Sequence, residues 1–361
     1  MQCLKGTDLH SHQIELKQRL CALRNTFVHT SKTLTPDHLF VGVGSDEAID
    51  GLLRAFCRPS SDKILTCPPT YGMYKVSAAV NDVGIVSVPL TPKEFQLQPL
   101  AINETLSNDP LIKLVYICSP GNPTAATIKK NDIQKVLEHP TWNGVVVVDE
   151  AYIDFAPEGA SLAEWVTEWP NLVVMQTLSK AFGLAGIRLG AAFTSPEIAR
   201  ILNSLKAPYN VSNPTSQIAL AALEPENLAV KTENVRKIVQ QRNRLIEELP
   251  RIPGVGNFLG GFEANFLLVE MLDSPQGKPS SEVALKAYES LAETRGVVVR
   301  FRGKEHGCAG CLRITVGTED ECTRLLTELK SVLQNIYLHG GNGWTAQEEQ
   351  NREVVANNVV A

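Results

Sequence analysis

Residues 144–152 read GVVVVDEAY, a run of four valines followed by two carboxylates and, at the end, a phenol. Continuous β-branched runs are typical of strands buried on both faces, as in a mainly parallel sheet covered by helices. Similar runs predict strands before and after it, at 40–44, 63–66, 84–88, 114–117, 172–177 and 189–193. Helical patterns such as 131–137 lie between them, so the sequence predicts a large α/β domain.

The flanking sequence predicts a second, smaller α/β domain. Leu16, Leu20, Leu23 and Phe27 share one face of a helix over 13–27, and a long charged helix over 225–249 acts as a connector. After it come strands at 266–269, 297–300 and 312–316 and helices at 281–294 and 319–336. The expected divisions are an N-terminal segment 1–30, a large domain 31–224, a small domain 225–338 and a disordered tail 339–361.

Composition excludes several classes of protein. The 361 residues are 43% hydrophobic and 20% charged, as in ordinary globular proteins. A net charge of −5 without a basic block argues against nucleic-acid and membrane partners, and no apolar run is long enough to cross a bilayer. Eight scattered cysteines and the absence of a signal pattern predict a cytoplasmic protein. Cys308 and Cys311 lack the second pair that structural zinc requires, so no metal is expected.

Two motifs follow strands at positions where α/β sheets bind ligands. Ser45 and Asp46 stand where the N-cap of a helix belongs, and free N–H groups there would bind a phosphate. An ordinary capped helix has the same sequence. In the stretch 119–124, SPGNPT, two prolines fix a turn and direct Asn122 outward, although a plain surface turn would look alike.

Two further motifs carry ionisable groups. Asp149 and Tyr152 follow the valine strand, where the aspartate is either a helix N-cap or an acid held against a cationic ring nitrogen. Residues 177–190 read TLSKAFGLAGIRLG, which sets Lys180 among hydroxyls and small apolar residues. An amine nucleophile requires a desolvated pocket, and we therefore expect Lys180 to be shielded from water.

Together the four motifs match the requirements of a pyridoxal phosphate enzyme. Lys180 would form the Schiff base, and Asp149 would keep the pyridine nitrogen protonated. The other groups surround the cofactor: Asn122 and Tyr152 at the phenolic oxygen, and Ser45, Asp46, Thr177, Ser179 and Arg188 around the phosphate.

Five stretches carry a family resemblance: CPPTYGMY at 67–74, 118–124, 148–152, 177–190 and GCLRITVGT at 310–318. Over residues 13–336 the sequence resembles fold-type I aminotransferases, and within them the histidinol-phosphate aminotransferases of fungal type. The resemblance implies that Tyr71 stacks on the pyridine ring and that Lys180 also shuttles a proton, with Asp149 and Tyr152 as further catalytic residues. It implies substrate contacts from Asn122, Arg313 and Arg300, although each arginine could instead form a surface ion pair.

The implied reaction converts histidinol phosphate and 2-oxoglutarate into imidazole acetol phosphate and glutamate, in histidine biosynthesis, by a symmetric homodimer. Three alternatives stay open: an aromatic aminotransferase, a phosphothreonine decarboxylase, or a cofactor-binding paralogue with little turnover. In the family an N-terminal arm closes over the substrate, and a tyrosine after it reaches the neighbouring subunit's cofactor phosphate. Here only LHSH, residues 9–12, stands before the first helix. We therefore expect cofactor binding with slow turnover.

Overall fold

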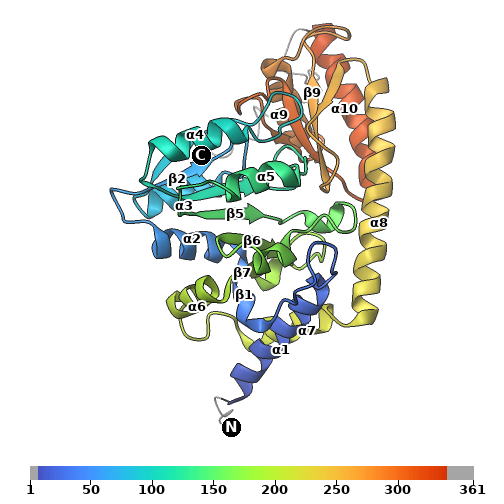
Figure 1. Ribbon diagram of the computed structural model, residues 1–361. Coiled ribbons are helices and arrows are strands. Elements are labelled where there is room, and N and C mark those ends of the chain that lie inside the picture. The colour runs from blue at the N-terminus through green and yellow to red at the C-terminus, as the bar shows by residue number, and fades with distance from the viewer. Residues whose placement is uncertain (1–6, 340–361) are drawn as a thin grey trace, which may run out of the picture. The chain divides into compact units, whose positions relative to one another are not determined.

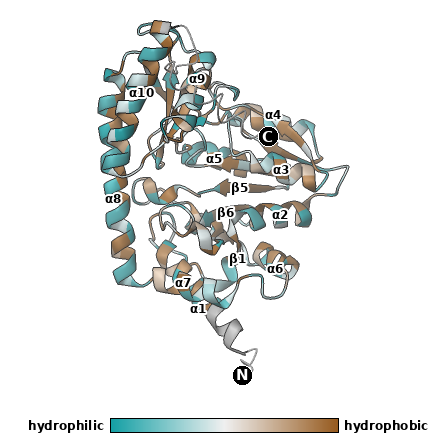
Figure 2. Cartoon of the chain, turned by 180° about the vertical axis from the view of Figure 1, so that it is seen from behind, coloured by the Kyte–Doolittle hydropathy of each residue, from teal (hydrophilic) through white to brown (hydrophobic). Residues whose placement is uncertain are grey.

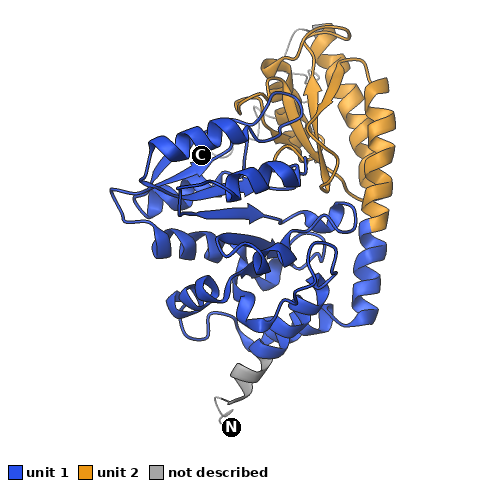
Figure 3. Cartoon of the chain, viewed as in Figure 1, with its two compact units in different colours: residues 1–122, 126–235 blue, residues 123–125, 236–361 orange. Residues whose placement is uncertain are grey.

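The computed structural model describes residues 7–339, and the chain divides into two compact units (Figures 1 and 3). The first unit takes the chain up to Asn122 and residues Ala126–Val235, and the second takes Pro123–Ala125 and the chain from Arg236. The expected boundary at 224/225 is the start of helix α8 (Pro225–Glu248), whereas the division falls inside that helix. Its second half belongs to the second unit because Leu245 joins that unit's core.

A seven-stranded sheet forms the centre of the first unit, in the order β1-β7-β6-β5-β4-β2-β3. Its strands are β1 (Leu39–Val43), β2 (Lys63–Thr66), β3 (Gly84–Ser87), β4 (Ile112–Cys118), β5 (Val145–Asp149), β6 (Leu172–Thr177) and β7 (Leu189–Thr194). Only β7 runs against the others, since it pairs antiparallel with both β6 and β1. The predicted α/β class and mainly parallel sheet are confirmed.

The valine strand β5 is buried at every position. Val145 and Val147 pack in a core cluster with side chains of α2 (Gly44–Phe56), α3 (Met73–Val80) and α6 (Pro196–Leu205). Val146 and Val148 point to the opposite face and are also fully buried. Figure 2 shows β5 as hydrophobic along its length. Burial on both faces is therefore the reason for the uninterrupted run.

The remaining helices of the first unit are α1 (Thr7–Arg24), α4 (Pro99–Asn108), α5 (Lys130–Leu137) and α7 (Asn213–Ala222). The first helix begins at Thr7, six residues earlier than predicted, so residues 9–12 belong to it rather than standing before it. It ends at Arg24, three residues earlier than predicted, and Phe27 adopts a positive φ of 57° outside it. The expected N-cap at Ser45 and Asp46 is wrong. Helix α2 begins at Gly44, and the N-cap position falls on Val43, two residues before Ser45, without a side-chain hydrogen bond.

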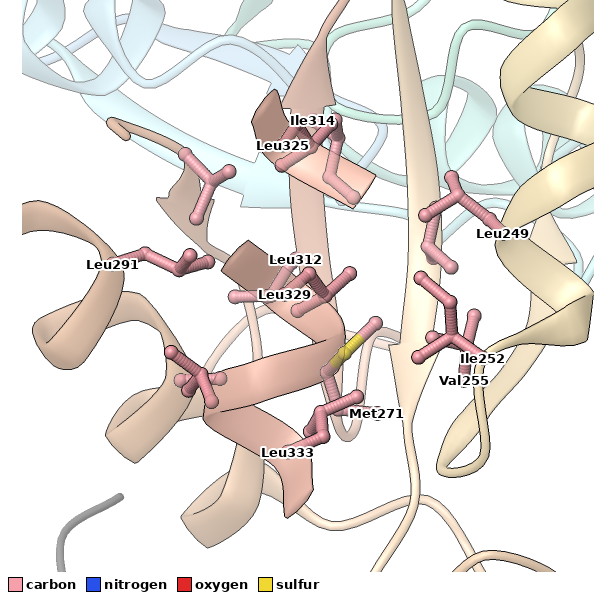
Figure 4. Packing of buried hydrophobic residues seen from close by; sticks show 14 of the residues in the cluster. Leu249, Ile252, Val255, Met271, Leu291, Leu312, Ile314, Leu325, Leu329 and Leu333 are labelled. Carbon is pink, nitrogen blue, oxygen red and sulfur yellow. The ribbon is translucent and has the colours of Figure 1, made fainter. Parts of the chain in front are cut away.

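The second unit contains a four-stranded antiparallel sheet in the order β10-β11-β9-β8. Its elements are β8 (Val255–Leu259), β9 (Phe266–Met271), α9 (Ser281–Glu293), β10 (Arg300–Phe301), β11 (Cys311–Thr315) and α10 (Glu319–His339). Leucines and other apolar residues of these elements, including Leu249, Leu312 and Leu329, interdigitate in one core (Figure 4). The predicted strand at 297–300 is wrong in extent, since only Arg300–Phe301 pairs in the sheet.

The expected disordered tail lies outside the described residues beyond His339. No helix within residues 7–339 has the length and apolar character needed to cross a bilayer. Cys308 and Cys311 are buried free thiols, and residues 7–339 contain no group of three potential metal ligands.

Candidate functional site

A cavity of about 160 Å³ opens in the first unit at the carboxyl ends of β4, β5 and β6. It brings together every residue that the sequence predicts for cofactor binding. The lining residues are Gly44, Ser45, Asp46, Tyr71, Cys118, Asn122, Asp149, Ala151, Tyr152, Thr177, Ser179, Lys180, Ala185 and Arg188. A larger hollow of about 620 Å³ lies between α1 and α6, but none of the four motifs reaches it. The smaller cavity is therefore the candidate site.

Asp149 is the last residue of β5, and only 2% of its surface is exposed. Its carboxylate accepts hydrogen bonds from the Tyr74 hydroxyl at 2.7 Å and from the Ala151 N–H at 3.1 Å. Burial nevertheless raises the pKa of Asp149 to about 6, since desolvation outweighs these bonds and the nearby charge of Lys180. A buried carboxylate in this state is stabilised by a cation placed against it.

Tyr74, which bonds the Asp149 carboxylate, packs between two other tyrosines. The Tyr74 ring packs face to face with Tyr116 at a centroid distance of 4.8 Å and edge-on against Tyr71 at 5.6 Å. Burial raises the pKa of Tyr74 well above its ordinary value, so its hydroxyl stays a donor to Asp149. Sequence reasoning missed Tyr74 as a functional residue. The signal was present, because Tyr74 stands only three residues after Tyr71 in the same 67–74 stretch.

Lys180 lies in the turn that follows β6, and its residue is exposed. The expected desolvated surroundings are therefore wrong for the chain as described. The reason is that the apolar run after Lys180, from Ala181 to Gly186, forms a partly exposed turn rather than a buried wall. The ammonium lies 5.5 Å from the ring centroid of Tyr152, which is itself buried. Lys180 thus faces an aromatic ring inside the cavity.

One wall of the cavity consists of hydroxyls and the start of α2. The Thr177 hydroxyl donates to Ser179 Oγ at 2.9 Å and accepts from the Ser179 N–H at 3.1 Å. Gly190 lies so close to α2 that a Cβ there would meet the Ser45 nitrogen at 2.3 Å. Gly44, Ser45 and Asp46 at the start of α2 line the cavity, where the helix N-terminus and its dipole favour an anion.

Arg188 completes this wall of the cavity, and its backbone conformation is strained. It adopts the left-handed conformation, with φ of 53°, and its carbonyl oxygen accepts from the Gly44 N–H at 3.0 Å. The guanidinium lies 3.6 Å from the Asp46 carboxylate, and both side chains are more than a third exposed. Asp46 also accepts a 3.3 Å hydrogen bond from the Tyr71 hydroxyl. The cation is thus held at the same end of the cavity as the helix start.

Asn122 is buried beside β4 in a turn that the Gly121 N–H closes by donating to the Ala126 carbonyl. Arg313 and Arg300 belong to the second unit, where they are direct partners across the β10–β11 pairing. The Arg313 guanidinium packs 4.9 Å from the ring centroid of Phe266. The structure therefore brings the two arginines together on one sheet, while the other predicted site residues line the cavity of the first unit.

The family described as aminotransferase class I and II matches residues 6–329. The chain is 57% identical to the histidinol-phosphate aminotransferase of Schizosaccharomyces pombe, over 90% of this chain and 85% of the relative. It is 48% identical to that of Saccharomyces cerevisiae, over 92% and 88%. Its fold resembles a solved histidinol-phosphate aminotransferase from Sinorhizobium meliloti in complex with pyridoxal-5'-phosphate. The TM-score is 0.76 at 23% identity, over 90% of this chain and 82% of that one.

Proposed function

The chain belongs to the class I and II aminotransferase family, and from that membership we propose that it is a histidinol-phosphate transaminase. The reaction is histidinol phosphate plus 2-oxoglutarate to imidazole acetol phosphate plus L-glutamate, a step of histidine biosynthesis. Fungal relatives at 57% and 48% identity over most of the chain support this substrate. The cofactor is pyridoxal phosphate, whose aldehyde links to amines and whose protonated ring withdraws electrons.

The residues of the cavity fit this cofactor. Burial raises the pKa of Asp149, and the nearby charge of Lys180 does not fully offset this effect. A pyridinium nitrogen placed against Asp149 would supply the missing positive charge. The start of α2 at Ser45 and Asp46 lines the same cavity as Ser179 and Arg188, so that helix N-terminus and the guanidinium could hold a phosphate together. This pairing of a buried carboxylate with an anion cradle in one cavity is the observation that carries the proposal.

Each predicted role follows from chemistry that the side chain can perform. Lys180 would supply the amine to which the cofactor's aldehyde attaches, and as a free amine it would accept a proton from the substrate's α-carbon. Asp149 would hold the proton of the pyridine ring, and Tyr71 would stack on that ring. Tyr152 and Asn122 contact the phenolic oxygen.

The remaining predicted residues bind either the phosphate of the cofactor or the substrate. Thr177, Ser179, Arg188 and the α2 N-terminus at Ser45 and Asp46 anchor the phosphate. In the second unit, Arg313 binds an acidic group of the substrate and Arg300 adds a second anion contact.

A substrate panel tests the proposal. The purified chain, supplied with pyridoxal phosphate and 2-oxoglutarate, is assayed for glutamate formation from histidinol phosphate and from phenylalanine, and for decarboxylation of phosphothreonine. We expect the highest kcat/KM for histidinol phosphate. A preference for phenylalanine, or release of carbon dioxide from phosphothreonine, would instead assign one of the alternative activities.

We further propose a cytoplasmic homodimer. Seven cysteines of the described chain are free and buried, which supports a reducing compartment. Large hydrophobic side chains exposed in the first unit, such as Phe27, Val28 and Tyr209 at 57–71%, support a contact with a second copy. Sedimentation equilibrium checks the mass, and a monomer at micromolar concentration would contradict the dimer.

A further inference from the structure

Asp154 is the centre of a buried ion-pair network outside the cavity. Its side chain is 11% exposed and accepts two hydrogen bonds from Arg24 Nη2, at 3.1 and 3.2 Å. Lys231 Nζ donates to the same carboxylate at 3.1 Å. Burial acts to raise the pKa of Asp154, but the two cations together hold it below its ordinary value. The network therefore joins α1, α8 and the segment after β5 through three buried charges.

One branch of the network reaches the Lys180 turn. Lys231 Nζ lies 5.1 Å from the ring centroid of Phe182, and the Lys231 side chain is only 15% exposed. A desolvated ammonium over an aromatic face is held more strongly than an exposed one. Phe182 follows Lys180 by two residues, and the Gly183 N–H donates to the Lys180 carbonyl within the same turn. Fixing the ring of Phe182 therefore restrains the backbone of Lys180.

The second branch reaches the ends of two strands. Arg24 Nε donates to Gln176 Oε1 at 2.7 Å, and Gln176 Nε2 donates to Glu150 Oε2 at 2.8 Å. Gln176 precedes Thr177 at the end of β6, and Glu150 follows Asp149 at the end of β5. Both Gln176 and Glu150 are buried. The carboxyl ends of β5 and β6 are thus tied to the same aspartate.

We propose that Asp154, Lys231 and Arg24 are positioning residues, which hold the Lys180 turn and the ends of β5 and β6 in the arrangement that transamination requires. The proposal rests on the proposed function of the cavity. A buried set of charges is often no more stable than apolar residues of similar volume, because desolvation offsets the attraction. A gain in folding stability therefore does not explain why three charges are placed here. Their directional bonds to the ends of β5 and β6 and their contact with the Lys180 turn do explain it, because such bonds fix geometry.

Amide hydrogen exchange on the full chain, with and without pyridoxal phosphate, tests the branch to the turn. Lys231→Met keeps the aliphatic stem and removes the charge. Exchange of the amides at 180–184 should become faster by about two- to thirtyfold, the range expected for loss of a cation–π contact. Lys231→Arg should restore slow exchange, and Lys75→Met, at an exposed lysine of α3, should leave it unchanged. Unchanged exchange in Lys231→Met would overturn the proposal.

A double-variant cycle isolates the contact itself. Phe182→Leu removes the aromatic face, so it should loosen the same amides as Lys231→Met. The double variant should loosen them no further than either single change, because both remove one interaction. Independent, multiplying effects would show that Lys231 does not act through Phe182.

The pH dependence of the visible absorption of bound pyridoxal phosphate separates positioning from mere folding. A lower folded fraction reduces the amplitude of this titration, whereas a displaced Lys180 moves its midpoint. Lys231→Met should move the midpoint and lower kcat more than it raises KM, and Lys231→Arg should reverse both. An unmoved midpoint would reject the positioning role. Failure of the unmodified chain to bind the cofactor would reject the proposed function, while the exchange measurements would still test the network.

Discussion

At Asp149, burial of the side chain opposes ionisation of the carboxyl group. In the cofactor-free chain its pKa is raised from 3.8 to about 6, so the folded state binds more protons than the unfolded state between these values. Stability from this residue therefore falls as the pH rises from about 4 to 6, and it stays low above that. A shift of about two units corresponds to about 3 kcal/mol.

Asp149→Asn should accordingly stabilise the cofactor-free chain at pH 8 by up to about 3 kcal/mol, and by less at pH 5. Urea denaturation at both pH values measures the difference. Saturating pyridoxal phosphate should stabilise the unmodified chain more than the Asp149→Asn variant, because only a carboxylate pairs with a pyridinium ring. Equal stabilisation of both would contradict the pairing.

Lys180 should be the residue that carries the cofactor. Borohydride reduction of the loaded chain should place the pyridoxyl group on the peptide that contains Lys180, as identified by mass spectrometry. Lys180→Ala should lose this label and lose transamination by several orders of magnitude, since no other lysine among residues 7–339 lines the cavity. Lys75→Ala should keep the label. A pyridoxyl group on another lysine of the unmodified chain would be incompatible with the assignment.

At the scale of elements, the contact between β7 and the start of α2 shapes the phosphate end of the cavity. Gly190→Ala places a Cβ 2.3 Å from the Ser45 nitrogen and 2.4 Å from the Gly44 carbonyl carbon, and neither backbone atom can move alone. We expect a loss of about 1–3 kcal/mol in the free energy of unfolding, with weaker binding of pyridoxal phosphate. Denaturation and fluorescence titration measure the two effects. Gly186→Ala meets nothing within 4 Å and should be neutral; equal effects of the two changes would refute this steric account.

The elements also differ in how far the sequence determines them. The limits of β2 and β6 agree with the prediction, because turn residues bound their apolar runs. The strand at 297–300 was predicted from local β-branched residues, but only its last residue found a partner, since pairing depends on β11. The sequence misplaces the start of α2 because the helix begins at Gly44, which has a φ of 74°, and no side chain caps it there.

The candidate site was more predictable than these limits. Its residues follow strand ends, and parallel strands bring their carboxyl ends to one edge. What the sequence could not supply was the environment of each group. Whether Lys180 is shielded, and whether Tyr74 reaches Asp149, depends on side chains from several elements packing in three dimensions.

At the scale of the whole molecule, the proposed cofactor-binding groups belong to the first unit, and so does Asn122, whereas the two proposed substrate-binding arginines belong to the second. Each unit has its own sheet and core, so a change in one core should leave the other intact. The cavity lies entirely in the first unit, and the arginine pair Arg300 and Arg313 lies in the second. Like charges on directly paired residues of two strands disfavour each other, and binding of an anion by both arginines would offset that cost.

Arg313→Met and Arg300→Met should therefore impair substrate binding without impairing cofactor binding. Loss of a charge-assisted hydrogen bond costs about 1.5–3 kcal/mol, so KM for histidinol phosphate should rise roughly ten- to a hundredfold. The dissociation constant for pyridoxal phosphate, from fluorescence titration, should stay within twofold of the unmodified value. Arg251→Met, an exposed arginine of the same unit, should change neither quantity. A loss of cofactor affinity as large as the loss of substrate affinity would contradict this assignment. The cofactor titration contains no substrate, so a residue that contacts only the substrate cannot change its result.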